Sequence, residues 1–205
     1  MQAILSFVLG YLTGCINPAV LLSKKKHVNL KEEGTGNLGA TNTALVLGKH
    51  SGAVVLIFDM FKSVFSYKLA KYLFRQLPYA GLIAGIGVLV GHCFPVFLHF
   101  QGGKGLASFG GLVLAHDYVL FVVLLILGLA ASYILDYGVY LAVTATVLFP
   151  VASCLRTGDP LDLLLTGIAA GLIFCMHIPN LKRAVTKEDP LRARDGLRRI
   201  FGKNS

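Results

Sequence analysis

The sequence is divided into long apolar stretches, and these stretches restrict the fold more than any other feature. A helix crosses the apolar part of a bilayer with about 20 apolar residues, or with fewer where the bilayer is thinned. Candidate stretches lie at 2–22, 52–74, 79–98, 105–115, 118–135, 139–155 and 161–177. The stretch at 105–115 is short, so we expect the bilayer to thin there or the loop before it to dip inward. Since lipid leaves no partner for unpaired backbone groups, the pattern predicts an all-α integral membrane protein with about seven transmembrane helices.

The positive charges predict how these helices are oriented. With the N-terminus outside, fourteen lysines and arginines fall on the inner side and four on the outer side. The positive-inside rule therefore favours an external N-terminus and a cytoplasmic C-terminus. The net charge of +9 would also suit a nucleic-acid-binding protein, but the charges form short clusters between apolar stretches. Because no continuous basic face results, we expect no nucleic-acid partner.

The remaining composition suggests one membrane domain without disulfides or metals. The chain divides into a membrane domain at 1–180 and a basic cytoplasmic tail at 181–205, where Leu191 to Lys203 form either an interfacial amphipathic helix or a solvated tail. No positive residue precedes the first apolar stretch, which is interpreted as a retained span. The inner side has no residues at metal-ligand spacing, so we expect no metal. The cysteines lie in apolar stretches without a C-x-x-C pair and are interpreted as packing residues: Cys15, Cys93, Cys154 and Cys175.

A glycine-rich loop at 99–108 is the first candidate site. Gly102, Gly103 and Gly105 surround Lys104. Without Cβ atoms such a backbone can approach an anion closely, and the lysine adds positive charge. The pattern indicates binding of a phosphate at the membrane surface, although a flexible hinge between two helices is also compatible with it.

A second segment, residues 34–42 (GTGNLGATN), is rich in neutral hydrogen-bond donors. Such groups can surround phosphate oxygens without adding charge. The candidate binding residues are Thr35, Gly36, Asn37, Gly39, Thr41 and Asn42. If Ala40 begins the next helix, the first amides of that helix would point at a bound anion. The same residue types are also favoured in turns and helix N-caps, so a structural role stays open.

The third segment carries His177 and Asn180 at the end of the last apolar stretch. The asparagine can orient the imidazole or a substrate hydroxyl, whereas an interfacial histidine without a chemical task is equally compatible. Pro179 is expected to limit the helix near this point. With the predicted orientation, all three segments fall at cytoplasmic helix ends, where they can converge on one site.

Other features are interpreted mainly as structural. Asp59 and Lys62 lie one helical turn apart inside an apolar stretch and are expected to form an internal ion pair, with proton or ion movement as the alternative. His92 is expected to shape the entry to the glycine-rich loop. Small-xxx-small pairs predict close helix packing at 81/85, 87/91 and 167/171.

Together the three segments resemble the bacterial membrane acyl-phosphate:glycerol-3-phosphate acyltransferases, the PlsY family. The resemblance rests on residues 34–42, on GHCFP at 91–95 followed by FQGGKGLAS at 100–108, and on His177-x-x-Asn180 with Arg183. It implies seven helices in the bacterial inner membrane, with the active site facing the cytoplasm. The implied reaction moves an acyl group from acyl phosphate to the sn-1 hydroxyl of glycerol 3-phosphate and forms lysophosphatidic acid. No cofactor is implied, and a monomer is expected to function.

The resemblance also implies roles for particular residues. Lys104 and the amides around it would hold phosphate, Thr35 stands where the family usually has serine, and His177 with Asn180 would line the acceptor site. Either His177 or the substrate phosphate would take the hydroxyl proton.

The chain departs from the family pattern near the acceptor site. Leu45 replaces a common arginine, residues 138–142 (GVYLA) replace a serine-rich helix start, and Lys187 and Asp189 replace a glycine and a glutamate. A small-solute transporter with a re-entrant glycine loop and an inactive paralogue are the alternative functions.

Overall fold

In the computed structural model, residues 1–188 and 192–194 are described, and they form helices without a strand. The all-α prediction is therefore confirmed. The helices are α1 (Gln2–Gly14), α2 (Pro18–Lys25), α3 (Ala40–Leu47), α4 (Lys49–Leu73), α5 (Ala80–Cys93), η1 (Val96–Leu98), α6 (Leu106–His116), α7 (Tyr118–Leu135), α8 (Val139–Thr157) and α9 (Pro160–Val185). The predicted tail helix at 191–203 lies almost entirely outside the described residues.

Among the described residues, five stretches are long and apolar enough to cross a membrane: Gln2–Lys25, Ala80–Leu98, Tyr118–Leu135, Val139–Thr157 and Pro160–Val185. Two further predicted spans correspond to α4, which is long but carries several charges, and to the short helix α6. The first stretch is divided, because α1 ends at Gly14 and α2 begins at Pro18. Asn17 starts the second helix by accepting a hydrogen bond from the Ala19 amide at 2.9 Å. A proline at the first helical position, preceded by a capping asparagine, explains why the predicted single helix is interrupted.

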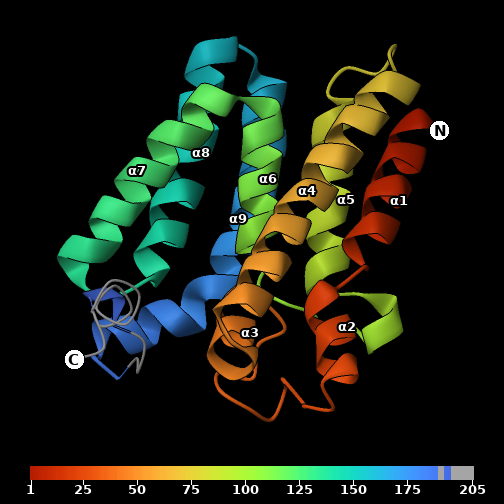
Figure 1. Cartoon of the computed structure of the whole chain (residues 1–205). Coiled ribbons are helices and arrows are strands. Elements are labelled where there is room, and N and C mark those ends of the chain that lie inside the picture. Colours follow the sequence, from red (N-terminus) through yellow and green to blue (C-terminus); the bar gives the residue numbers. More distant parts are fainter. Residues whose placement is uncertain (189–191, 195–205) are drawn as a thin grey trace.

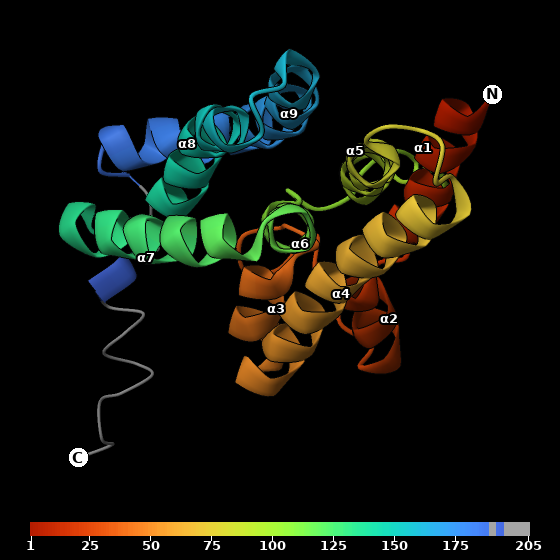
Figure 2. The same cartoon turned by 90° about the horizontal axis from the view of Figure 1, so that it is seen from above.

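The helices form two groups that are joined by α6 and α9. Figure 1 shows α1, α4 and α5 side by side on one flank and α7 with α8 on the other, and Figure 2 shows α6 between α4 and α7 when the molecule is seen from above. Helix α1 packs mainly on α5, α4 on α6, and α8 on α9. Helix α6 therefore links the two groups, and its first residue directly follows the glycine-rich loop.

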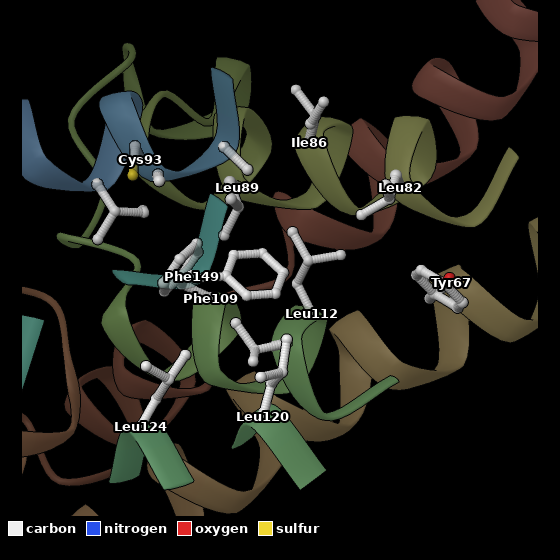
Figure 3. Close-up of a cluster of buried hydrophobic side chains, with 14 residues drawn as sticks. Tyr67, Leu82, Ile86, Leu89, Cys93, Phe109, Leu112, Leu120, Leu124 and Phe149 are labelled. Atoms are coloured by element: carbon white, nitrogen blue, oxygen red, sulfur yellow. The ribbon is translucent and has the colours of Figure 1, made fainter. Parts of the chain in front are cut away.

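The largest apolar core surrounds α6. Phe109 of α6 meets Phe149 of α8 edge to face, with ring centroids 5.7 Å apart, and both side chains are fully buried. Figure 3 shows this pair beside Leu89, Leu112 and Leu120, which come from three different helices. In a bilayer such contacts stabilise the fold through close packing, since lipid is itself apolar.

The small-residue pair at 87/91 allows α5 to touch the backbone of α1. A Cβ atom on Gly87 would lie 2.2 Å from the Phe7 carbonyl oxygen, and one on Gly91 would lie 2.1 Å from the Tyr11 carbonyl oxygen. No side chain fits at these distances, so glycine is required, and the predicted close approach is confirmed here.

The other two pairs behave differently. Cβ atoms on Gly81 and Gly85 would meet side chains, those of Tyr67 and Leu112, and not the backbone of a neighbouring helix. Around positions 167 and 171 no atom of the described residues lies within 4 Å of the added Cβ. The prediction of close packing is therefore wrong for the last pair.

The cysteines were predicted to be packing residues. This prediction is confirmed for the buried Cys15 and Cys93 and is wrong for the exposed Cys175.

A buried polar cluster fixes the end of α6 that is distant from Lys104. His116 Nε2 lies 2.9 Å from Ser153 Oγ of α8 and 3.1 Å from Asp162 Oδ1 of α9, and Ser153 donates to the other oxygen of Asp162 at 2.6 Å. His116 Nδ1 lies 3.2 Å from the hydroxyl of Tyr67 on α4. Four helices are thus joined at one histidine. This cluster has no sequence signal, because its members are far apart along the chain.

Candidate active site

The three segments singled out from sequence meet at one cavity of about 620 Å³. From the segment at 34–42 the cavity is lined by Thr35, Asn37, Gly39, Ala40 and Thr41; from the glycine-rich loop by Lys104 and Gly105; and from α9 by His177 and Asn180. The predicted convergence of the segments is confirmed. Gly36, Asn42, Gly102 and Gly103 do not line the cavity.

Two helix N-termini lie at the polar end of this cavity. Helix α3 begins at Ala40 after Gly39, and α6 begins at Leu106 after Gly105; neither start has a side-chain cap. The first amides of a helix have no partner within that helix, and the helix dipole adds partial positive charge there. Since Lys104 also lines the cavity, this end of it is suited to bind an anion such as phosphate.

The glycine-rich loop is held against the end of α5. The amide of Gly102 donates to the Cys93 carbonyl at 3.0 Å, and the amide of Gly103 donates to the His92 carbonyl at 3.1 Å. A Cβ atom on Gly102 would lie 1.9 Å from the His92 oxygen. These two glycines therefore permit tight packing of the loop, and their amides are already engaged within the protein. Gly105, with a φ of 78°, turns the chain into α6.

Asn42 holds the loop at 34–42 from the inside. Its side chain is fully buried, its oxygen accepts from the Thr35 amide at 2.6 Å, and its amide group donates to the carbonyls of Leu30 at 2.9 Å and Glu33 at 3.1 Å. Asn42 is therefore a residue that shapes the loop and holds the Thr35 backbone beside the cavity.

His177 and Asn180 lie on one face of α9, which continues through Pro179 to Val185. The predicted helix end at the proline is thus wrong. His177 Nδ1 lies 2.8 Å from the Ile173 carbonyl oxygen. Since a carbonyl only accepts, Nδ1 carries the hydrogen, and the other ring nitrogen of the neutral imidazole is an acceptor. Asn180 accepts a hydrogen bond from the ammonium of Lys104, which connects the third segment to the second.

Beneath the glycine-rich loop lies the predicted ion pair of Asp59 and Lys62, with 2.7 Å between the carboxylate and the ammonium. The structure adds His92, whose Nδ1 is 2.9 Å from the Lys62 ammonium. Lys62 also donates to the carbonyls of Gly14 and Ile16, where α1 ends. The group therefore ties α4 to α5 and α1, as a structural ion pair would. Its charges are paired locally, so the transporter alternative gains no support.

The cavity continues from its polar end into an apolar groove between helices. Phe109 and Val113 of α6 and Leu124 of α7 form its deep, buried part. Leu56 of α4 and Leu129 of α7 also line it and are 44% and 53% exposed, so the groove opens sideways between these helices. A ligand with a charged head and an apolar tail fits this combination.

The positions that depart from the family pattern lie partly at the cavity. Gly138, Val139 and Leu141 at the start of α8 line it, and they make this wall apolar where the family pattern has a serine-rich helix start. Leu45 is 44% exposed and does not line the cavity.

A sequence model of the family described as Glycerol-3-phosphate acyltransferase matches residues 4–187. A glycerol-3-phosphate acyltransferase of Thermoanaerobacter pseudethanolicus is 34% identical over 184 residues, which are 89% of this chain and 92% of the relative. One of Bacillus velezensis is 32% identical over 191 residues, covering 93% of this chain and 97% of the relative.

A solved structure has the same arrangement of helices. The crystal structure of PlsY, an integral membrane glycerol 3-phosphate acyltransferase, in its glycerol 3-phosphate form is 28% identical, with a TM-score of 0.85 over 98% of this chain and 100% of that one. Its lysophosphatidic acid form gives a TM-score of 0.82 over 92% of this chain and 94% of that one.

Proposed function

This chain belongs to the glycerol-3-phosphate acyltransferase family and transfers an acyl group to glycerol 3-phosphate in a membrane, and we propose that its acyl donor is an acyl phosphate. The observation that carries the proposal is the single cavity in which a polar end with two helix N-termini and Lys104 continues into an apolar groove. An acyl phosphate has this shape and polarity, with a phosphate joined directly to an apolar chain.

The residues around the polar end then have distinct tasks. Lys104 and the first amides of α6 hold the phosphate of the donor and stabilise charge that develops when it leaves. Thr35, Asn37, Gly39 and Thr41 hold the phosphate of glycerol 3-phosphate at the start of α3. Because the protein has little covalent chemistry to perform, a large part of its rate acceleration comes from holding both substrates in reacting geometry.

The reaction joins the sn-1 hydroxyl oxygen of glycerol 3-phosphate to the acyl carbon, while the bond from that carbon to the phosphate oxygen breaks. The hydroxyl proton passes to the departing phosphate, and the products are lysophosphatidic acid and inorganic phosphate. His177 accepts a hydrogen bond from the hydroxyl through Nε2 and orients it, and Asn180 holds the Lys104 ammonium in place.

The same proposal includes the orientation of the protein. Seven spans, with α4 and α6 added to the five long apolar stretches, give an external N-terminus and a cytoplasmic C-terminus in the bacterial inner membrane. The support is the excess of lysines and arginines at the ends that carry the cavity's polar side. The cavity is built within one chain, which supports a functional monomer.

The test is formation of lysophosphatidic acid by purified protein in detergent, supplied with palmitoyl phosphate and labelled glycerol 3-phosphate. Wild-type protein is expected to form product, and Lys104→Ala to lose about a hundredfold or more in kcat, as when an oxyanion-stabilising group is removed. Lys31→Ala is the matched control, because Lys31 is exposed, contacts Gln101 and lies outside the cavity. Folded wild-type protein that uses palmitoyl coenzyme A but not palmitoyl phosphate would overturn the proposed donor.

A further inference from the structure

We propose that Gly110, which lies beside Phe121 in the wall of the apolar groove, determines which acyl chain lengths the protein accepts. The inference rests on the proposed function, since it assigns the groove to the acyl chain of the donor. It concerns one position of α6 that lies in the wall of the groove and carries no side chain.

Gly110 lies at a depth that an acyl chain must pass. Helix α6 begins after Gly105 at the polar end, and Gly110 follows five residues later, which is about 7.5 Å along the helix at 1.5 Å per residue. Val113, which also lines the cavity, lies one turn further in the same direction. A short chain therefore ends near Gly110, whereas a long chain continues past it.

The space beside Gly110 is open to a side chain. A Cβ atom there would lie 3.6 Å from Cε2 of Phe121, at ordinary contact distance, and the described residues offer no second contact within 4 Å. The neighbouring Gly111 differs, because its Cβ would lie 2.3 Å from the Met60 carbonyl oxygen of α4. Gly111 thus serves helix packing, while the missing side chain at Gly110 leaves groove volume free.

A larger residue at Gly110 would fill part of the groove beside Phe121 without disturbing the contact of α6 with α4, which Gly111 makes. It would exclude the distal part of a long chain and leave the polar end unchanged. The expected result is a change in chain-length preference and not a general loss of activity.

The experiment compares kcat/KM for palmitoyl phosphate and octanoyl phosphate in wild type and Gly110→Leu. The ratio of kcat/KM for palmitoyl phosphate to kcat/KM for octanoyl phosphate is expected to be about tenfold or more lower in Gly110→Leu than in wild type. Such a decrease corresponds to two or more methylene groups that lose their burial. Gly110→Ala should give a smaller shift in the same direction. Phe121→Ala, added to Gly110→Leu, should restore part of the preference for palmitoyl phosphate. Gly171→Leu is the matched control, since this glycine of α9 also has open space around it but lies outside the groove.

An unchanged ratio in folded Gly110→Leu protein, or an equal loss with both donors, would overturn the inference. Failure of the proposed donor gives a different result, because then wild-type protein forms no product from either acyl phosphate. In that case binding of long-chain and short-chain lysophosphatidic acid to wild type and Gly110→Leu decides the inference. If the ratio of the affinity for long-chain to that for short-chain lysophosphatidic acid were the same in both proteins, the role of Gly110 in chain length would be contradicted.

Discussion

The ammonium of Lys104 donates a hydrogen bond to the side-chain oxygen of Asn180, and this contact joins the glycine-rich loop to α9. The two residues are far apart in sequence and belong to different segments of the candidate site. The contact holds a flexible lysine in one position at the polar end of the cavity, which the starts of α3 and α6 also line.

Removal of this contact should impair the reaction without unfolding the protein. Asn180→Ala is expected to lower kcat/KM for palmitoyl phosphate about ten- to hundredfold, which is the effect of losing a hydrogen bond to a charged group. Steady-state kinetics in detergent measures the change, and thermal unfolding serves as the control for folding. Activity equal to wild type would remove Asn180 from the role of positioning Lys104.

The pH dependence of a His177 variant tests where the hydroxyl proton goes. Glutamine can still present a polar group near the Nε2 position but does not titrate, so His177→Gln is expected to lower kcat while the shape of the pH profile stays the same. The measurement is kcat at saturating substrate over a range of pH. Loss of the acidic limb in the variant would instead assign proton acceptance to His177.

The buried ion pair predicts unequal effects of single and double substitutions. Asp59→Asn leaves the Lys62 ammonium buried without its carboxylate, and is expected to destabilise the protein by about 3–5 kcal/mol. Asp59→Leu combined with Lys62→Met should cost less than Asp59→Asn, because no uncompensated charge remains. Thermal unfolding in detergent measures both. A double variant less stable than the single one would show that Lys62 acts chiefly through its hydrogen bonds to the carbonyls of Gly14 and Ile16.

At the opposite end of the helices, Tyr79 donates a hydrogen bond to Asp159 at 2.6 Å, and this contact should make stability depend on pH. The bond to the carboxylate raises the pKa of Tyr79 to about 12, and the bonds from Tyr79 and from the Leu161 amide lower the pKa of Asp159. The hydrogen bond between Tyr79 and Asp159 thus stabilises the folded protein fully at pH values between 3.8 and 10.0, the ordinary pKa values of the carboxyl and the phenol. It is lost as the pH falls through the lowered pKa of Asp159 or rises towards that of Tyr79.

The measurement is the difference in Tm between wild type and Tyr79→Phe as a function of pH. This difference is expected to be constant around neutral pH and to shrink at both extremes. Arg156→Ala, which removes the neighbouring ion pair with Asp117, controls for general effects of pH on this end of the molecule. A difference in Tm that does not change with pH would contradict the assigned bond.

Some structural features could be predicted from residues that are close in sequence, whereas others depend on contacts between residues that are far apart along the chain. The ion pair of Asp59 and Lys62 could be predicted because its members are one helical turn apart, but the approach of His92 from α5 could not. The helix break before Pro18 was missed, although the Asn17-Pro18 pair is a recognisable start signal. Pro179 predicts a helix end by its residue type alone, yet α9 continues through it to Val185.

For the candidate site, residue types and spacing identified Lys104, His177, Asn180 and Thr35, and all of them line the cavity. The same reasoning gave Gly102, Gly103 and Asn42 a place beside the ligand, whereas the structure engages their polar groups within the protein. A glycine that accommodates a ligand and a glycine that accommodates a neighbouring backbone have the same sequence signal, so only the packing distinguishes them.

The sequence by itself determined that the chain is helical and apolar enough for a membrane, and which three polar segments line the candidate site, because these properties depend on local composition and periodicity. Only the tertiary structure decided which amides stay available at the starts of α3 and α6, how Asn180 reaches Lys104, and where Gly110 leaves the groove open. These relationships join residues that are distant along the chain, and they are set by how closely the helices pack.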